Sequence, residues 1–338
     1  MKPTLGWGII GTGGIAAAFT QALRASSRGR VVSVAGSSPE KARAFARQWE
    51  LPADAASVDE LVADPAVEAV YIASPHPLHE AHALAAIRAR KAVLCEKPLS
   101  TSVQSAERIV EAARGASVFL MEAYMYRCHP LLGRALELLK SGSIGRIVHA
   151  RADFGFRVHR DPDGRLFDPG LGGGAILDVG GYPLSFARLI AGLVEAKPFA
   201  DPVELSARGQ LGPTGVDELA FAALRFSSGM TAEIACATRH ELGTRAAVYG
   251  ESGWLELPNP WIPRGDRQGL QSDLILHRDG HEPEHTLVTT GLATYAIEAE
   301  LVADTLPALE PSAPSMSSAD TLANMRVMEA WSHALRSD

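Results

Sequence analysis

Residues 5–16 read LGWGIIGTGGIA, and this stretch decides the fold of the first part of the chain. Leu5 to Ile10 is a short apolar run typical of a buried strand, and an alanine-rich segment typical of a helix continues to about Leu23. Between them the spacing is G-x-G-x-x-A, in which Gly11 permits a tight turn and Gly13 lets the backbone approach a pyrophosphate. The context therefore predicts a dinucleotide-binding loop formed by Gly11, Thr12, Gly13, Gly14 and Ile15.

Apolar strands and helical segments then alternate as far as a strand at Val118 to Met121. This alternation predicts a doubly wound parallel α/β sheet, in which ligands bind beyond the carboxyl ends of the strands. Two such ends are Ser74-Pro75-His76 and Glu96-Lys97-Pro98. We expect Ser74, Pro75, His76 and Glu96 to face the same cleft as Gly11 and to contact the cofactor.

Lys97 lies where the apolar strand 93–95 runs into the cleft. Lysine is rarely buried without a task, so a lysine in this place is a candidate catalytic group that also contacts the cofactor. The alternative is a strand that ends in a surface ion pair.

The second strand, Val31 to Ala35, ends in Gly36-Ser37-Ser38 without the carboxylate that binds the ribose of NAD. Small hydroxyls at Ser37 and Ser38, with Lys41 nearby, favour the 2′-phosphate of NADP, although NAD remains possible. Alternatively, the serines cap the helix that begins at Pro39, and both roles are compatible.

His76, His79 and His82 repeat every third residue. We expect this spacing to spread the rings around a helix surface without forming a metal site, and we expect His79 to lie near the cofactor. Farther along, the stretch 121–130 is either ordinary core or, with Arg127 and His129 partly exposed, part of the cleft.

After about residue 145 long alternating segments replace this pattern, which predicts an α+β part with an open, mostly antiparallel sheet. We therefore place a dinucleotide-binding domain at 1–123 and a substrate and dimerisation domain at 124–338, whose C-terminal helix is free to pack back on the first domain. The glycine-rich stretch 172–183 interrupts the strands and leads into a helix.

Asp178 and Tyr182 lie four residues apart in this stretch, on one face if it is already helical. A phenol works as an acid or base when a neighbouring cation favours its ionised form, and Lys97 is the obvious neighbour. Otherwise Asp178 is a helix cap and Tyr182 a half-buried aromatic.

The strand 218–226 is apolar on both faces, with Leu219, Phe221 and Ala223 on one of them. One face can be covered by the chain's own helices, and a second copy is the simplest cover for the other. The pattern predicts a homodimer or a larger homo-oligomer.

The 338 residues are 46% hydrophobic and 21% charged, with a net charge of −7. No basic block suggests nucleic acid, and no stretch is long and apolar enough to span a membrane. The three cysteines are far apart with no CxxC, which favours a reducing, cytoplasmic location.

With the Gly11 loop, Glu96-Lys97-Pro98 and the 178–182 segment DVGGY together, the chain resembles the Gfo/Idh/MocA oxidoreductase family almost end to end. It is most similar to the branch of dimeric dihydrodiol dehydrogenase, NADP-dependent D-xylose dehydrogenase and glucose–fructose oxidoreductase. The resemblance implies a Rossmann domain, an open sheet used for dimerisation, and catalysis by Lys97 and Tyr182. Ser74-Pro75-His76 departs from the Thr-Pro-Asn of the family.

We therefore expect an NADP-dependent dehydrogenase that acts on a hydroxyl of a small polyhydroxylated substrate, a sugar or cyclic diol. Asp178 would orient the substrate or Lys97. A short-chain dehydrogenase would need Tyr-x-x-x-Lys, and none of the tyrosines has a lysine four residues on. The alternative outside enzymes is a regulator that senses the dinucleotide without turnover. Such a regulator would not need both Lys97 and Tyr182, so their presence argues against it.

Overall fold

The computed structural model describes residues 4–159, 164–262 and 271–336. The chain divides into two compact units, one of residues 1–128 and 292–321 and one of residues 129–291 and 322–338. From the sequence we assigned all of 124–338 to the second domain, whereas this division gives 124–128 and 292–321 to unit 1. The helix within 292–321 joins unit 1 because its apolar side chains are buried against that sheet.

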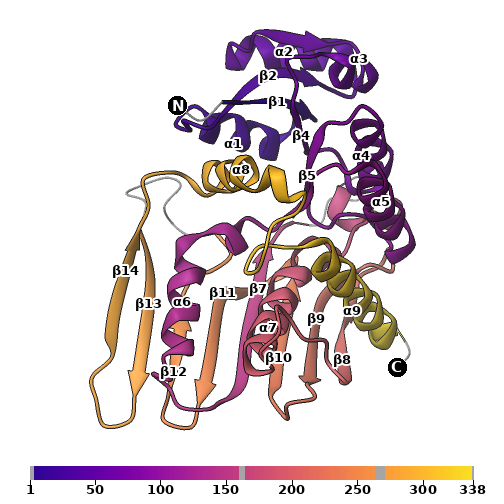
Figure 1. The fold of residues 1–338 in the computed structure, drawn as a ribbon. Helices are drawn as coiled ribbons and strands as arrows, with labels where there is room; N and C mark the ends of the chain where they lie inside the picture. The colour runs from indigo at the N-terminus through magenta and orange to yellow at the C-terminus, as the bar shows by residue number, and fades with distance from the viewer. Residues whose placement is uncertain (1–3, 160–163, 263–270, 337–338) are drawn as a thin grey trace. The chain divides into compact units, whose positions relative to one another are not determined.

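Unit 1 contains a six-stranded parallel sheet in the order β3-β2-β1-β4-β5-β6 (Figure 1). The predicted doubly wound sheet is confirmed. The strands are β1 (Leu5–Ile10), β2 (Gly29–Ala35), β3 (Ala53–Ala55), β4 (Ala69–Ile72), β5 (Ala92–Glu96) and β6 (Leu120–Ala123). The short strand β3 has no clear sequence signal, because three residues are too few for a periodic pattern.

Helices cover both faces of this sheet. They are α1 (Gly14–Leu23), α2 (Pro39–Trp49), α3 (Val58–Ala63), α4 (His79–Arg88), α5 (Val103–Ala116) and α8 (Thr294–Thr305). Trp7, Phe19, Tyr71 and Val302 share one core cluster, so α1 and α8 cover the same face. Gly8 points to the other face, where Leu61 of α3 lies against it.

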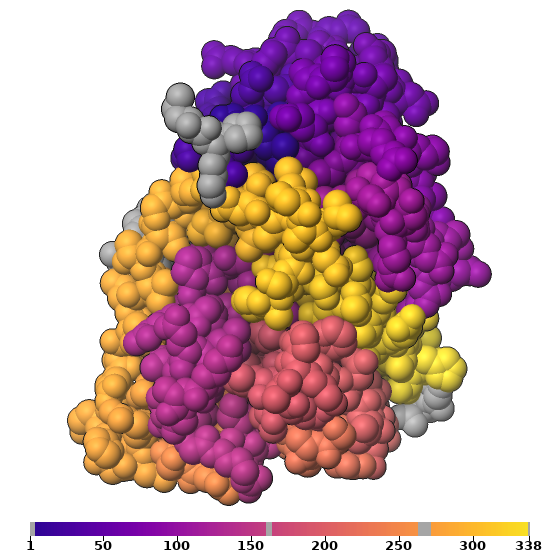
Figure 2. Space-filling model, viewed as in Figure 1, coloured from indigo at the N-terminus to yellow at the C-terminus, as the bar shows by residue number. Residues whose placement is uncertain are grey.

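Helix α8 lies beside α1 although it is far away in the sequence (Figure 1; orange against indigo in Figure 2). Polar contacts support this packing. The Ser26 hydroxyl donates to Glu300, with 2.8 Å between the oxygens, and Arg28 pairs with Asp304 at 2.5 Å. Helix α8 is therefore part of the dinucleotide-binding fold.

Unit 2 contains an eight-stranded sheet in the order β14-β13-β12-β11-β7-β10-β9-β8. Among the described strand pairs of this sheet, β7–β10 is parallel and the others are antiparallel, which confirms the predicted open, mostly antiparallel sheet. The strands are β7 (Ile147–Arg157), β8 (Glu204–Leu211), β9 (Asp217–Arg225), β10 (Thr231–Ala237), β11 (Arg239–Gly250), β12 (Gly253–Leu257), β13 (Gln271–Arg278) and β14 (Glu284–Thr289).

Helices α6 (Pro130–Lys140) and α7 (Gly181–Val194) pack on one face of this sheet, α7 against β7 and β10 and α6 beside β13 and β14 (Figure 1). In β9, Ala220, Ala222 and Leu224 are buried, whereas Phe221 on the opposite face is 45% exposed. Helix α9 (Ser318–Arg336) ends the chain, and it belongs to unit 2 from Leu322 on.

Candidate active site

The loop Gly11–Ile15 joins β1 to α1 in unit 1. Gly11 has φ +122°, and a Cβ there would lie 2.5 Å from the Ala73 carbonyl oxygen, so only glycine fits. At Gly13 and Gly14 an added Cβ would meet nothing within 4 Å. The two glycines thus leave open space over the backbone, as a ligand that contacts the backbone requires.

Helix α1 begins at this open space. Its N-cap is Gly13, and no side chain caps the helix, so the first N–H groups have no intrahelical acceptor. Ile15 in the first turn is 43% exposed. Uncapped N–H groups at a positive dipole end fit a pyrophosphate, and the residues of this loop therefore suit a dinucleotide.

The turn after β2 carries the residues predicted to select the cofactor. The Ser38 hydroxyl accepts a hydrogen bond from the Lys41 amide at 3.4 Å, and Ser38 is the N-cap of α2. The predicted capping of this helix is therefore confirmed for Ser38. Ser37 and Lys41 are exposed. Glu40, in the same first turn, is fully exposed, and hydrogen bonds from its own amide and from Ser38 lower the pKa of its carboxyl. A negative charge therefore lies next to the Ser38 hydroxyl.

The three histidines after β4 differ from the expectation of a helix surface. His79 is completely buried and His76 is 7% exposed. Nδ1 of His79 lies 2.9 Å from the Pro98 carbonyl oxygen, and Nε2 lies 2.8 Å from that of Ser74. Burial lowers the pKa of His79 to about 4, so the ring is neutral and donates only one of these contacts. His79 bridges the ends of β4 and β5, because α4 begins directly beside them.

Glu96 is the last residue of β5 and Lys97 follows it, at the same carboxyl edge at which the Gly11 loop follows β1. Strand β4 lies between β1 and β5. The Tyr71 hydroxyl donates to Glu96 Oε1 at 2.5 Å, and the Lys97 amide donates to Glu96 Oε2 at 3.2 Å. Both Glu96 and Lys97 are partly exposed. The bonds to Tyr71 and to the Lys97 backbone hold the carboxylate in place, which orients the start of the Lys97 turn.

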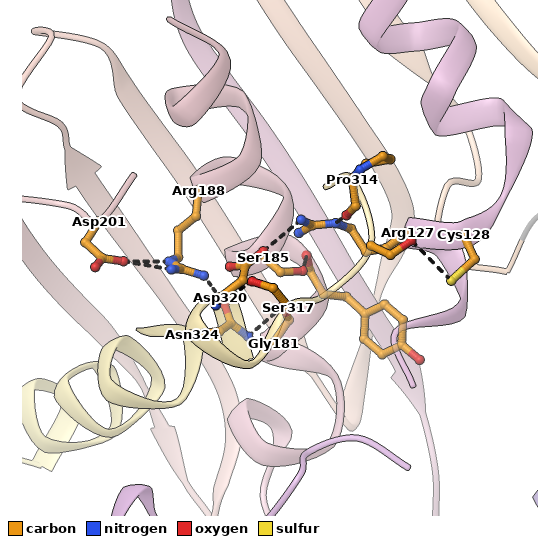
Figure 3. A network of polar contacts seen from close by, with 12 residues as sticks. Arg127, Cys128, Gly181, Ser185, Arg188, Asp201, Pro314, Ser317, Asp320 and Asn324 are labelled. Carbon is orange, nitrogen blue, oxygen red and sulfur yellow. Dashed lines mark hydrogen bonds and ion pairs between the residues drawn. The ribbon is translucent and has the colours of Figure 1, made fainter. Parts of the chain in front are cut away.

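Arg127 and His129 are not partly exposed, as the sequence had suggested, but 1% and 3% exposed. Arg127 pairs with Asp320 at 2.8 Å and also donates to the Pro314 carbonyl (Figure 3). The His129 ring accepts the Leu131 amide at 3.1 Å and caps α6. These side chains are structural, because each finds a partner that compensates for its burial.

In unit 2 the glycine-rich stretch forms a π-helix, Ile176–Gly180, that continues into α7. Asp217 on β9 accepts the Ile176 amide at 2.6 Å and so supports its start. Burial raises the pKa of Asp217 to about 6. Asp178 within the π-helix is buried and pairs with Arg165 at 2.9 Å. Asp178 is not the cap of this helix, whose N-cap is Ala175.

Tyr182 lies in the first turn of α7 and is 6% exposed. Its ring meets Phe154 edge-on, with centroids 5.2 Å apart, and Trp261 at 6.1 Å. The Trp261 indole donates to the Asp153 carbonyl at 2.8 Å, which fixes this ring. The structure thus brings Phe154, Trp261 and Tyr182 into one buried aromatic cluster.

Polar contacts anchor α7 in unit 2. Buried Arg188 pairs with Asp201 at 2.8 Å and contacts Asn324 at 3.4 Å (Figure 3). The Asn324 amide also donates to the Gly181 carbonyl at 3.5 Å, one residue before Tyr182. The helix end that carries Tyr182 is therefore held from α9.

Over the described ranges, no group of three or more His, Cys, Asp or Glu side chains lies close enough to hold a metal ion. Contrary to the sequence prediction, the described stretch Pro169–Val194 is long and apolar enough to cross a membrane, but 89% of its most apolar window is buried in the structure, as in the core helix of a folded protein.

Two family models match the chain. The model of the oxidoreductase family with an NAD-binding Rossmann fold matches residues 5–124, and the model of the GFO/IDH/MocA C-terminal domain matches residues 133–256. Trans-1,2-dihydrobenzene-1,2-diol dehydrogenase of Mus musculus is 36% identical over 77% of this chain and 76% of its own length. The chain belongs to the Gfo/Idh/MocA oxidoreductase family.

Further relatives agree with this membership. The enzyme of the same name from Danio rerio is 33% identical over 87% of the chain and 86% of its own length. Aldose-aldose oxidoreductase from Caulobacter crescentus shares the fold with a TM-score of 0.86 at 24% identity, over 99% and 98% of the two chains. A 3-ketoreductase from Actinomadura kijaniata, solved with NADP, has a TM-score of 0.83 at 26% identity, also over 99% and 98%. The resemblance seen in the sequence is confirmed.

Sequence reasoning missed the buried acids of unit 1. Glu122 lies in β6 directly after the apolar residues 118–121, as Glu96 directly follows the apolar residues 92–95, and this repeated pattern could have revealed it. Glu298 lies within a helix of weak amphipathic pattern, and its burial had no signal in the sequence.

Proposed function

We propose that this member of the Gfo/Idh/MocA family is an NADP-dependent dehydrogenase that acts on a CH–OH group of a sugar or cyclic diol. The observation that carries the proposal is Lys97 at the carboxyl edge of the sheet that carries the open Gly11–Ile15 loop. The names of the relatives, diol dehydrogenases and an aldose oxidoreductase, support the substrate class.

The residues suggest the following chemistry. A bound nicotinamide supplies the acceptor of a hydride from the substrate carbon in the oxidative direction. Tyr182 accepts the proton of the substrate hydroxyl at its phenolic oxygen, and the Lys97 ammonium favours the phenolate and steers the alcohol oxygen. This requires the two side chains to lie near each other in the working enzyme. Structures of the related 3-ketoreductase include variants with a lysine or a tyrosine replaced, which is consistent with such a pair.

Asp178 has a supporting role in this proposal. Its carboxylate is fixed by Arg165 at 2.9 Å, and its burial makes an ionic contact stronger than it would be in water. We infer that Asp178 accepts a hydrogen bond from a second substrate hydroxyl or orients Lys97. A neighbouring hydroxyl is a feature that sugars and cyclic diols share.

We also propose that the chain prefers NADP to NAD. Ser37 is exposed at the end of β2 and Lys41 lies in the first turn of α2, so a hydroxyl and an ammonium are available for a 2′-phosphate. The solved ketoreductase that binds NADP supports the choice. Because Glu40 is anionic in the same turn, measurable use of NAD is expected as well.

A substrate panel tests the function. The purified chain is incubated with NADP or NAD and a set of aldoses and cyclic trans-diols, and the absorbance of the reduced cofactor is followed. Turnover of at least one class is expected. Tight cofactor binding without turnover on the whole panel would favour the dinucleotide-sensing regulator instead.

We also infer that the chain forms a homodimer or larger assembly through the face of the unit 2 sheet that lacks helices. Phe221, Trp254 and Leu287 are 45%, 37% and 53% exposed, and apolar rings on a sheet face are typical of an interface. A cytoplasmic location stays a prediction that rests on the free thiols of Cys95, Cys128 and Cys236.

A further inference from the structure

Glu122 is a buried carboxyl beside the Lys97 turn that the proposed chemistry does not use. It is 2% exposed and lies on β6, where it is paired in register with Cys95 on β5. Cys95 precedes Lys97 by two residues. A carboxyl group in such a place costs stability unless it forms contacts that compensate for its burial.

The contact of Glu122 is with the turn itself. Its Oε1 accepts the Leu99 amide at 2.8 Å, and Leu99 is the second residue after Lys97. From the other side, His79 contacts the Pro98 carbonyl at 2.9 Å. The backbone that carries Lys97 is therefore held by a carboxyl from β6 and an imidazole from α4.

Burial raises the pKa of Glu122 to about 7, and the nearby Asp320 charge acts in the same direction. The Leu99 amide, the Thr321 hydroxyl and the Lys97 ammonium act in the opposite direction. The thiol of Cys95 and the phenol of Tyr124 also feel its charge. In the small void that Glu122 lines, its other described neighbours are apolar or hydroxyl side chains and are not charged: Leu99, Val110, Leu120, Met316, Ser318 and Thr321.

We propose that Glu122 is a positioning residue for Lys97, which holds the turn through the Leu99 amide and adds a negative charge near the ammonium. This rests on the proposed function, in which Lys97 stabilises the Tyr182 phenolate. When Glu122 takes up a proton, the hydrogen bond to Leu99 loses its ionic component and weakens. The rate of hydride transfer should then fall on the acidic side of neutral pH.

The variant Glu122→Gln separates charge from shape, because the amide oxygen can still accept the Leu99 N–H. We expect kcat about three- to tenfold below wild type at pH 8, since an ionic hydrogen bond is worth roughly twice a neutral one. The plots of kcat against pH for wild type and Glu122→Gln should merge below pH 6, where Glu122 of the wild type is neutral as well. The KM for NADP should stay unchanged, because the Gly11 loop is untouched.

Glu111→Gln is the matched control, since it removes an exposed carboxylate from α5 of the same unit. Its pH profile should follow that of the wild type. A Glu122→Gln profile identical to wild type, or one lowered equally at every pH, would overturn the proposal, because an equal loss would mean a purely structural role.

A second measurement needs no turnover. In protein labelled with 15N-leucine, the Leu99 amide signal, assigned by its loss in Leu99→Met, should titrate with a midpoint near pH 7. It should stay constant in Glu122→Gln. A Leu99 signal of the wild type that does not move between pH 5.5 and 8.5 would sink the proposal even if the variant failed to fold. Absence of turnover with a titrating Leu99 signal would instead speak against the proposed function.

Discussion

Tyr182 and Lys97 are the residues on which the proposed chemistry depends. Tyr182→Phe removes the proton acceptor, and Lys97→Met removes the ammonium that stabilises it. Each substitution should lower kcat by roughly 10²-fold or more, which is the range of general acid–base catalysis.

The control for both variants is the binding of NADPH, measured by fluorescence titration. NADPH binding should be largely retained, because we expect the phosphate contacts to come from the Gly11 loop. Near-normal turnover in either variant would refute the assignment.

Glu298 shows how a single buried acid can cost stability. It is fully buried in α8, and both of its carboxyl oxygens lack a hydrogen-bond partner among the described residues. Burial, together with the charge of Glu96, raises the pKa of Glu298 well above its ordinary value. The folded chain therefore keeps a proton that the unfolded chain releases above about pH 4.5.

The sign of the pH effect follows from this difference. Between the ordinary pKa and the raised one, the folded state binds more protons than the unfolded state, so stability falls as the pH rises. Each pH unit in that window costs up to about 1.4 kcal/mol. Glu298→Gln should therefore gain in Tm relative to wild type from pH 5 to pH 8.

Differential scanning calorimetry measures this change. Glu300→Gln on the same helix is the control, because its carboxylate is partly exposed and accepts from Ser26 at 2.8 Å. Its Tm difference from wild type should not grow with pH. A constant Tm difference for Glu298→Gln would mean that Glu298 does not retain its proton.

At the scale of elements, we predict that the turn between β2 and α2 selects the cofactor. Ser37→Asp places a carboxylate where the ribose hydroxyls of NAD would bind and where a 2′-phosphate would be repelled. The ratio of kcat/KM for NADP to that for NAD should fall at least tenfold. Ser38 is left intact in this variant because it caps α2.

The matched control is Ser37→Asn, which has the same shape without the charge. It should keep most of the NADP preference. The proposal would be wrong if the wild type preferred NAD, or if Ser37→Asp left the ratio unchanged.

For the whole molecule, we predict assembly through the exposed face of the unit 2 sheet. The wild type should scatter light as a dimer or larger species at micromolar concentration. Phe221→Arg puts a charge on the exposed side of β9, where the ring is 45% exposed, and should shift the mass towards the monomer.

Circular dichroism should show that Phe221→Arg stays folded, because the buried side of β9 is unchanged. Glu111→Gln on α5 of unit 1 serves as a surface control that should not alter the mass. A monomeric wild type would contradict the prediction.

Local patterns determined much of this protein from the sequence alone. The Gly11 loop, the Ser38 cap and the start of α2 at Pro39 depend on neighbours a few residues away, so they could be predicted. The alternation in β9 showed two apolar faces, and the structure then showed which of them is buried. The resemblance to the family rested on such short patterns too.

Only the tertiary structure decided which polar groups are buried. Arg127 finds Asp320, which is 193 residues away, and Glu122 finds the Leu99 amide. The membership of α8 in unit 1 depends on the same kind of distant packing. The free energy of a buried charge is set by the partner that the fold brings to it, and no local pattern in the sequence records that partner.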